Sequence, residues 1–255
     1  MEVVKLQIVI YTINMEYINN IIEYYDELFS VSMPQKKLYE DLTKSYMPAK
    51  LLRVGCGTGA LEHWLSKNGH DVTGIETNQD MIETANRRRR LPNMALRFFQ
   101  MSSLEMTRFL GKGFYNVISC LNDELIFRND KILVRKLFYD CKTLLAENGV
   151  FVLHLTNFAK YQINEKTVLP IRESIRTKLN SLAYERDGKY FLSQSLEHYG
   201  KKPIPVLKDA EFLPIGKEDI ESFAKEAGFS DIQFYGDWDL SPLTEKSDNI
   251  VAIIR

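Results

Sequence analysis

The chain lacks the cysteine pattern of several protein classes. It has three cysteines among 255 residues, and Cys56, Cys120 and Cys141 show no spacing typical of a metal site. An odd number of widely separated cysteines favours reduced thiols in a cytoplasmic protein over a disulfide framework. The sequence therefore predicts no bound metal and no structural disulfide.

An excess of charge of one sign is also missing. Lys and Arg number 33 against 34 Asp and Glu, so the formal net charge is −1. Such a balance argues against nucleic acid or an acidic membrane as a partner. The one basic run, 87–90, falls at the end of an expected helix, where cations interact favourably with the helix dipole. An RNA-binding patch is the alternative interpretation of that run.

Hydrophobic runs long enough to cross a bilayer are absent as well. The apolar run 3–13 is too short to span a membrane and lacks the basic start and cleavage site of a signal peptide. We interpret it as an extra strand, or as residues that precede the native start if translation begins at Met15. No membrane partner is expected.

Apolar runs and helical periodicity alternate through the first two thirds of the chain. Residues 15–47 predict two amphipathic helices that form a cap, because their apolar residues recur at helical spacing. Strands that alternate with helices predict a mostly parallel sheet with helices on both faces. The expected strands are 50–55, 71–76, 95–101, 114–120 and 149–156, and the expected helices are 58–68, 79–90, 103–110 and 129–146.

The pattern changes in the last third. Residues 168–213 are strand-like without intervening helices, which predicts an antiparallel flap of three or four strands inserted after the fifth core strand. A helix at 217–227 and strands at 229–236 and 248–254 then return the chain to the sheet as a hairpin. We interpret the whole as one α/β domain with a cap (15–47), a core (48–157 and 214–255) and a flap (165–213).

The run 51–61 indicates a cofactor-binding loop between a buried strand and a helix. Gly55, Gly57 and Gly59 allow positive φ and let a ligand approach the backbone, while the following helix offers unpaired N–H groups. Glu76 ends the next apolar run, 21 residues after Gly55. A strand-end acid at this separation binds ribose hydroxyls in nucleotide-binding βαβ units.

Two cofactor families use this geometry. The spacing Gly55-x-Gly57-x-x-Ala60 fits the dinucleotide pattern, so an NAD-binding oxidoreductase is one alternative. The actual residues Val-Gly-Cys-Gly-Thr-Gly at 54–59, followed by Gly-Ile-Glu-Thr-Asn-Gln-Asp-Met-Ile at 74–82, resemble the class I S-adenosylmethionine-dependent methyltransferases. The tail from Ala227 to Arg255 resembles the last third of small-molecule members. The resemblance implies a Rossmann-like, mostly parallel seven-stranded sheet and S-adenosylmethionine as cofactor.

The same resemblance implies where the cofactor binds. In that family the glycine loop holds the methionyl part, the strand-end acid holds the ribose, and a tyrosine of an N-terminal motif closes over the methionine end. Transferred position by position, the implied cofactor contacts are Tyr25, Arg53, Gly55, Cys56, Gly57, Gly59, Glu76, Thr77, Met81, Met101, Ser102, Ser103, Leu121 and Asn122.

Three positions depart from the family pattern. Arg53 stands where the first motif normally carries an acid, and Ser102 stands where an acid normally binds the adenine amino group. Asn116 replaces the acid that usually opens the fourth strand. These departures leave open a non-catalytic protein that only binds the cofactor.

The resemblance favours methyl transfer to a nitrogen or oxygen atom of a small-molecule acceptor. Such a displacement requires alignment of the nucleophile and no obligatory base, so no catalytic residue is assigned. The turn 122–125 lacks the prolines of nucleic-acid base methylases, although an RNA methyltransferase stays an alternative. The end of the fifth strand, 155–158, distantly resembles glycine and sarcosine N-methyltransferases, with Thr156 in place of an arginine. Candidate bases, each with an ordinary structural explanation, are Asp123, His154, His198 and Tyr199.

Overall fold

The computed structural model describes residues 17–128, 130–198 and 200–255. The run 3–13 lies outside these ranges. The described chain divides into two compact units, one of residues 17–30 with 161–214 and one of residues 31–160 with 215–255.

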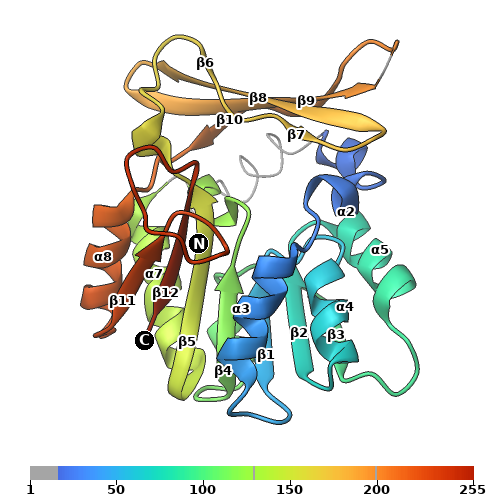
Figure 1. The fold of residues 1–255 in the computed structure, drawn as a ribbon, viewed down its shortest axis with the longest axis vertical. Helices are drawn as coiled ribbons and strands as arrows, with labels where there is room; N and C mark the ends of the chain where they lie inside the picture. Colours follow the sequence, from blue (N-terminus) through green and yellow to red (C-terminus); the bar gives the residue numbers. More distant parts are fainter. Residues whose placement is uncertain (1–16, 129, 199) are drawn as a thin grey trace. The chain divides into compact units, whose positions relative to one another are not determined.

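The larger unit is built on a seven-stranded sheet with the strand order β11-β12-β5-β4-β1-β2-β3 (Figure 1). Strands β1 to β5 are parallel, and β12 pairs antiparallel with both β5 and β11. The predicted mostly parallel seven-stranded sheet is confirmed. The strands are β1 (Lys50–Val54), β2 (Asp71–Glu76), β3 (Leu96–Gln100), β4 (Tyr115–Cys120), β5 (Leu145–Thr156), β11 (Ile232–Tyr235) and β12 (Asn249–Ile254).

Helices follow most of these strands, as the alternating pattern predicts. Helix α4 packs against β2, α5 against β3 and α7 against β5. Side chains cap three of the helices, because the oxygens of Ser32, Asn78 and Asp130 accept backbone N–H groups of α3, α5 and α7. The helices are α3 (Met33–Thr43), α4 (Ala60–Lys67), α5 (Gln79–Arg89), α6 (Met106–Phe109), η2 (Glu124–Phe127), α7 (Lys131–Leu144), η3 (Phe158–Lys160) and α8 (Lys217–Glu226).

A buried tyrosine connects helix α3 to the sheet. Tyr39 is fully buried, and its hydroxyl shares a hydrogen bond of 2.7 Å with Ser119 Oγ on β4. Burial raises the pKa of Tyr39 to about 12, so the phenol stays neutral. The second half of the expected cap is therefore a helix anchored in the sheet core.

The strand order reverses between β1 and β4. From β1 the chain builds outward through β2 and β3, and it then returns to the other side of β1 with β4 and β5. In open α/β sheets, ligands bind at the carboxyl ends of the strands beside such a switch point. The loops that follow β1 and β4 are therefore the place to look for a site.

The smaller unit contains an antiparallel sheet and the N-terminal turns. Its strands follow the order β10-β9-β8-β6, with β7 paired to β8. The sheet has five strands, where three or four were expected. The sequence did not predict β6 and β7, because they have only two residues each. The elements are η1 (Ile18–Ile21), α2 (Tyr25–Leu28), β6 (Thr167–Val168), β7 (Arg172–Glu173), β8 (Thr177–Arg186), β9 (Lys189–His198) and β10 (Ile204–Phe212).

The N-terminal turns are held to this sheet by polar contacts. Arg176 Nε donates to Glu27 Oε1 at 2.8 Å, and Asn20 Nδ2 donates to the Pro205 carbonyl at 2.7 Å. The single helix expected in the first half of 15–47 is wrong for the described residues, since η1 and α2 are two separate short turns. Asn19 and Asn20, which have low helix propensity, lie within the first turn.

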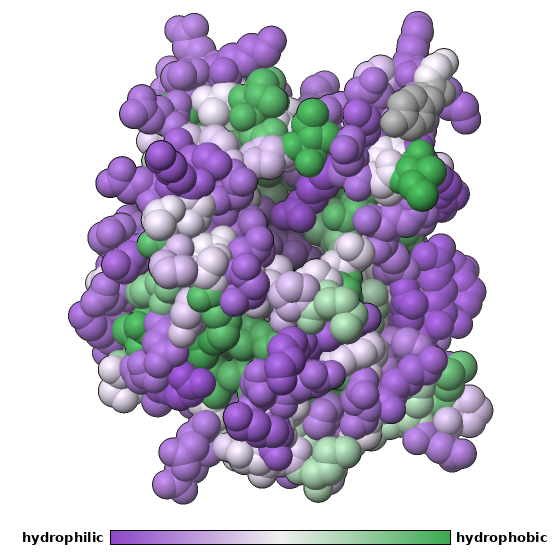
Figure 2. All heavy atoms as spheres, in the orientation of Figure 1, coloured by the Kyte–Doolittle hydropathy of each residue, from purple (hydrophilic) through white to green (hydrophobic). Residues whose placement is uncertain are grey.

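The surface carries no broad hydrophobic area on the face in view. Figure 2 shows hydrophilic side chains over most of that face, with hydrophobic ones in small groups, as is ordinary for folded proteins. Among the helices of the described ranges, none has the length and apolar character needed to cross a bilayer. The three cysteines are free and buried.

Candidate functional site

The glycine loop after β1 has the backbone that its sequence predicts. Gly55, Gly57 and Gly59 have φ values of +69°, +54° and +76°, a region that L side chains rarely adopt. A Cβ at Gly59 would lie 2.7 Å from Cε1 of Phe98 on β3, and one at Gly55 would lie 2.6 Å from Cγ of Glu124. Both positions therefore favour glycine for conformation, and at Gly59 the Phe98 ring also leaves no space for a Cβ.

Replacing Gly59 by alanine is expected to lower the free energy of unfolding by about 3 kcal/mol. About 1 kcal/mol reflects the left-handed backbone and the rest reflects overpacking against Phe98. Gly113 is a matched control, because it has φ +60° with nothing within 4 Å of its Cβ position, so Gly113→Ala should cost only the backbone part. Urea unfolding of both variants measures the difference, and equal losses would show that space at Gly59 is not limiting.

Glu76 joins the glycine loop to the start of α5. Its Oε2 accepts the backbone N–H of Gly57 at 3.2 Å, and its Oε1 accepts those of Thr77 and Asn78 at 2.8 and 3.0 Å. Bonds from N–H groups to a carboxylate are stronger than neutral ones. The acid predicted from its spacing therefore lies beside the loop, at the carboxyl end of β2.

The turn after β4 is strained and held by polar contacts. Asn122 and Asp123 are consecutive non-glycine residues with φ values of +57° and +64°. The Asp123 carboxylate accepts the backbone N–H of Thr156 at 2.6 Å and its hydroxyl at 2.9 Å. Strained backbone of this kind concentrates at functional sites. The turn lies across the switch point from the glycine loop.

Comparison with known proteins identifies this arrangement. A family model described as a methyltransferase domain matches residues 51–149, which contain the glycine loop, Glu76 and the turn after β4. A Geobacillus sp. (strain WCH70) protein named as a methyltransferase is 23% identical over 223 residues, covering 81% of this chain and 84% of that protein. The chain is an S-adenosylmethionine-dependent methyltransferase.

Two further comparisons extend over most of the methyltransferase. The glycine/sarcosine N-methyltransferase of Aphanothece halophytica is 23% identical over 231 residues, covering 88% of this chain and 83% of that enzyme. The amino pentose methyltransferase CalS10 of Micromonospora echinaspora, solved with S-adenosylmethionine bound, superposes with a TM-score of 0.65 at 18% identity. That match covers 91% of this chain and 95% of the other. S-adenosylmethionine is the cofactor, and the glycine loop and the carboxylate of Glu76 fit it.

Arg53 contacts the backbone of the glycine loop and a carboxylate of α4. Its Nε donates to the Gly55 carbonyl at 3.1 Å and lies 4.0 Å from Oε1 of Glu62 on α4. Both side chains are buried, with 8% and 2% of their surface exposed. The carboxylate that pairs with Arg53 is thus supplied by α4. A direct contact of Arg53 with the cofactor stays a prediction.

The other two departures from the family pattern have local roles. Asn116 Oδ1 accepts the backbone N–H of Lys50 at 2.8 Å, which joins β4 to the amino end of β1, away from the cofactor loop. Ser102 Oγ accepts the N–H of Leu104 at 3.3 Å in the turn after β3.

Two charged residues at the site were missed by the sequence reasoning. Glu124 packs over Gly55, and the Arg128 guanidinium donates through Nη2 to Ser103 Oγ at 2.7 Å. Arg128 is buried with 9% of its surface exposed. Glu124 belongs to the same turn as Leu121 and Asn122, which were the only residues of that turn predicted to contact the cofactor. An acidic residue at the end of a core strand was the sequence signal that could have identified it. For Arg128, which follows η2, no signal was available.

The candidate bases are engaged elsewhere. The His154 ring stacks on Trp238 with centroids 4.7 Å apart, and its Nδ1 accepts the backbone N–H of Asn122 at 3.3 Å. Asp123 binds Thr156, as described above. His198 belongs to the smaller unit, where its ring lies 4.7 Å from that of Tyr24 at an interplanar angle of 52°, and residue 199 lies outside the described ranges. No base is assigned.

Burial disfavours Cys56 as a nucleophile. Cys56 lies within the glycine loop, but burial raises the pKa of its thiol well above the usual range, and the nearby carboxylates of Glu62 and Glu76 act in the same direction. The described ranges also contain no group of three or more His, Cys, Asp or Glu residues that could hold a metal ion.

The larger unit contains all but one of the predicted cofactor residues. Tyr25 belongs to the smaller unit, where it stacks on Phe29 with centroids 4.7 Å apart. The roles of all the predicted residues, Tyr25 included, as cofactor contacts stay predictions. The residues of the larger unit, which belong to the carboxyl ends of β1 to β4 and the segments that follow them, are Arg53, Gly55, Cys56, Gly57, Gly59, Glu76, Thr77, Met81, Met101, Ser102, Ser103, Leu121 and Asn122.

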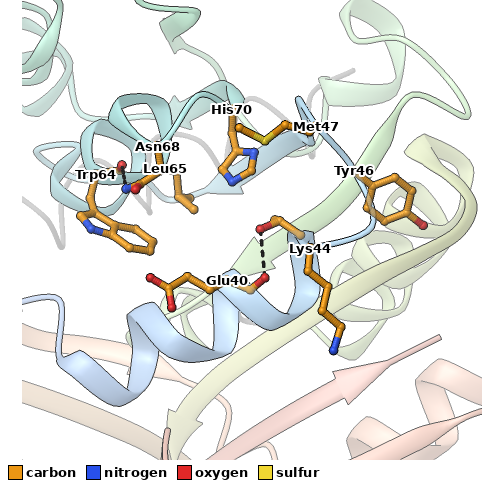
Figure 3. Close-up of a pocket in the computed structure, with 9 residues that line it drawn as sticks. Glu40, Lys44, Tyr46, Met47, Trp64, Leu65, Asn68 and His70 are labelled. Atoms are coloured by element: carbon orange, nitrogen blue, oxygen red, sulfur yellow. Dashed lines mark hydrogen bonds between the residues drawn. The ribbon is translucent and has the colours of Figure 1, made fainter.

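A cavity of about 240 Å³ lies at the opposite edge of the sheet (Figure 3). Met47 and His70 precede β1 and β2, so this cavity is at the amino ends of the strands. Ala49 N–H donates to His70 Nδ1 at 3.2 Å, and burial lowers the pKa of His70. None of the predicted cofactor residues belongs to its lining, which consists of Glu40, Thr43, Lys44, Tyr46, Met47, Trp64, Leu65, Asn68 and His70.

Proposed function

We propose that this methyltransferase transfers the methyl group of S-adenosylmethionine to a nitrogen or oxygen atom of a small-molecule acceptor. The observation that carries the proposal is the acidic turn after β4, where Asp123 and Glu124 follow one another beside the cofactor loop. The carboxyl groups of this turn offer no cation to a phosphate backbone and suit an amine or a hydroxyl donor. The turn also lacks an aromatic residue on which an extruded base could stack.

The relatives support an amine as the preferred acceptor. One relative is named for the N-methylation of glycine and sarcosine, and one structural neighbour is named as an amino pentose methyltransferase. Both names denote small molecules that carry an amine. We also propose a cytoplasmic location, which the three free thiols support.

The protein's own contribution is alignment. Bound S-adenosylmethionine supplies an electrophilic methyl group on its sulfonium. The glycine loop and Glu76 fix one end of the cofactor, and orientation of two reactants of this kind can contribute roughly 7–11 kcal/mol to the lowering of the barrier. Hydrogen bonds from Thr156 to the Asp123 carboxylate join the end of β5 to the turn after β4 and hold that turn in place.

Methyl transfer from labelled cofactor tests the proposal. The protein is incubated with trideuteromethyl S-adenosylmethionine and a panel of small amines, hydroxylated compounds and carboxylic acids, with total RNA as a separate arm, and products are examined by mass spectrometry. We expect the label in a small molecule, foremost an amine. Label that enters only RNA, and is lost in the Arg87→Glu/Arg88→Glu variant of the exposed basic run, would favour the RNA methyltransferase instead.

A further inference from the structure

Two acidic side chains flank the glycine loop, and of these only Glu76 has so far been assigned to the cofactor. Glu76 binds the backbone of Gly57 and belongs to the ribose end of the predicted cofactor site. Glu124 lies over Gly55, since a Cβ at that glycine would meet its Cγ at 2.6 Å and its Oε2 at 2.9 Å. The second carboxylate is therefore placed at the first glycine, where the resemblance to the family puts the methionyl end of the cofactor.

The surroundings of Glu124 oppose its ionisation. Burial raises the pKa of Glu124 to about 7, and the negative charge of Glu76 adds to this, while Arg128 and Arg53 act in the opposite direction. Glu76 belongs to β2, Arg53 to β1, and Arg128 follows η2, so charged groups from three elements face this carboxyl. On the β5 side, Asp123 is turned to Thr156, and His154 accepts the Asn122 N–H. The raising effects outweigh the lowering effects of the two arginines on the pKa of Glu124.

The cofactor carries a cation suited to this position. The methionyl end of S-adenosylmethionine, and of its demethylated product S-adenosylhomocysteine, bears an α-ammonium group. An ammonium next to a half-buried carboxylate favours the ionised form of the carboxyl. Binding of the cofactor and ionisation of Glu124 are therefore linked.

We propose that Glu124 binds the α-ammonium of the cofactor, and that cofactor binding therefore releases the proton that Glu124 carries in the free protein. The carboxylic acid gives its proton to solvent, and the resulting carboxylate pairs with the incoming ammonium, so charge and protons balance. This inference concerns the cofactor alone and does not depend on which acceptor is methylated.

The sign of the pH dependence follows from the linkage. Glu124 has a pKa of about 7 in the free protein, and the pairing lowers its pKa in the complex. Affinity is therefore highest above pH 7 and falls as the pH drops below it, by about tenfold between pH 8 and pH 6. The released proton follows the same curve, from about 0.9 per site at pH 6 to about 0.1 at pH 8.

Calorimetric titration of S-adenosylhomocysteine measures both quantities. Titrations at pH 6 in two buffers of different ionisation enthalpy give the number of protons released per site, and repetition at pH 8 gives the change in affinity. For Glu124→Gln, which mimics the neutral form, we expect no proton release and the same Kd within about twofold at both pH values. Glu105→Gln is the matched control, because Glu105 is an exposed acid just before α6, and it should behave as the wild type.

A second ligand makes the test independent of how well the variant folds. 5′-Methylthioadenosine lacks the amino-acid end, so its binding to the wild type should release no proton at pH 6. Proton release by S-adenosylhomocysteine but not by this ligand supports the proposal. Equal release by both ligands, no release by either, or undiminished release in a folded Glu124→Gln protein would each overturn it.

Discussion

Replacing Glu76 by alanine is expected to weaken S-adenosylhomocysteine binding at least 100-fold. The carboxylate accepts the backbone N–H groups of Gly57, Thr77 and Asn78, so its loss releases the glycine loop from the start of α5. It also removes the acceptor expected to bind the ribose hydroxyls. Hydrogen bonds to a charged group contribute about 1.5–3 kcal/mol each, and two of them correspond to at least 100-fold in Kd.

Calorimetry of the wild type and the Glu76→Ala protein measures this loss, with NAD as a control ligand. Glu83→Ala is the matched control, since Glu83 is an exposed acid on α5 whose side chain contacts Gln79 rather than the loop. Its affinity should equal that of the wild type. An unchanged affinity in Glu76→Ala would show that the ribose is bound elsewhere.

The second large effect concerns Arg53. Substitution by methionine is expected to lower the free energy of unfolding by about 3–5 kcal/mol, because it leaves Glu62 as a buried charge without its guanidinium. The contact with the Gly55 carbonyl is lost at the same time. Glu62 has only 2% of its side chain exposed, so water cannot replace the cation.

A double substitution separates the ion pair from the volume of the side chains. Arg53→Met/Glu62→Met removes both charges, and replacement of a buried ion pair by apolar residues is often neutral for stability. We expect urea unfolding to show the double variant as more stable than Arg53→Met alone. A double variant less stable than either single variant would mean that the pair contributes through something other than mutual neutralisation.

The sheet and the glycine loop were predictable because their signals are local. A buried strand, three alternating glycines and a helix occupy one continuous run at 51–61, and Glu76 follows at a spacing set by a single helix. The mostly parallel pairing of the core strands also follows from the alternation of strands and helices, whereas the order of the strands in the sheet does not. The positive φ values at Gly55, Gly57 and Gly59 are the direct consequence of that sequence.

The electrostatics of the site were not predictable, because they depend on contacts between distant parts of the chain. The buried charge of Arg53 is paired with Glu62, and this pairing depends on how α4 packs on the sheet. Glu124 lies 69 positions from Gly55 in the sequence, so its place over the glycine follows from the approach of β4 to β1. Periodicity carries no information about such pairs.

The same reasoning explains the errors in the smaller unit. Strands β6 and β7 are two residues long and are defined only by their pairing with β8. The first expected helix followed apolar spacing, but its residues instead pack as short turns, with η1 against β10 and α2 against β7. In both cases tertiary contacts outweigh local propensity.

A crystal structure of the protein with S-adenosylhomocysteine tests the account most directly. We predict that the ribose hydroxyls bind Glu76, that the methionyl end lies over Gly55, and that its ammonium contacts Glu124. A ligand bound with its ribose away from Glu76, or in the cavity beside Trp64 and His70 at the opposite edge of the sheet, would contradict the account.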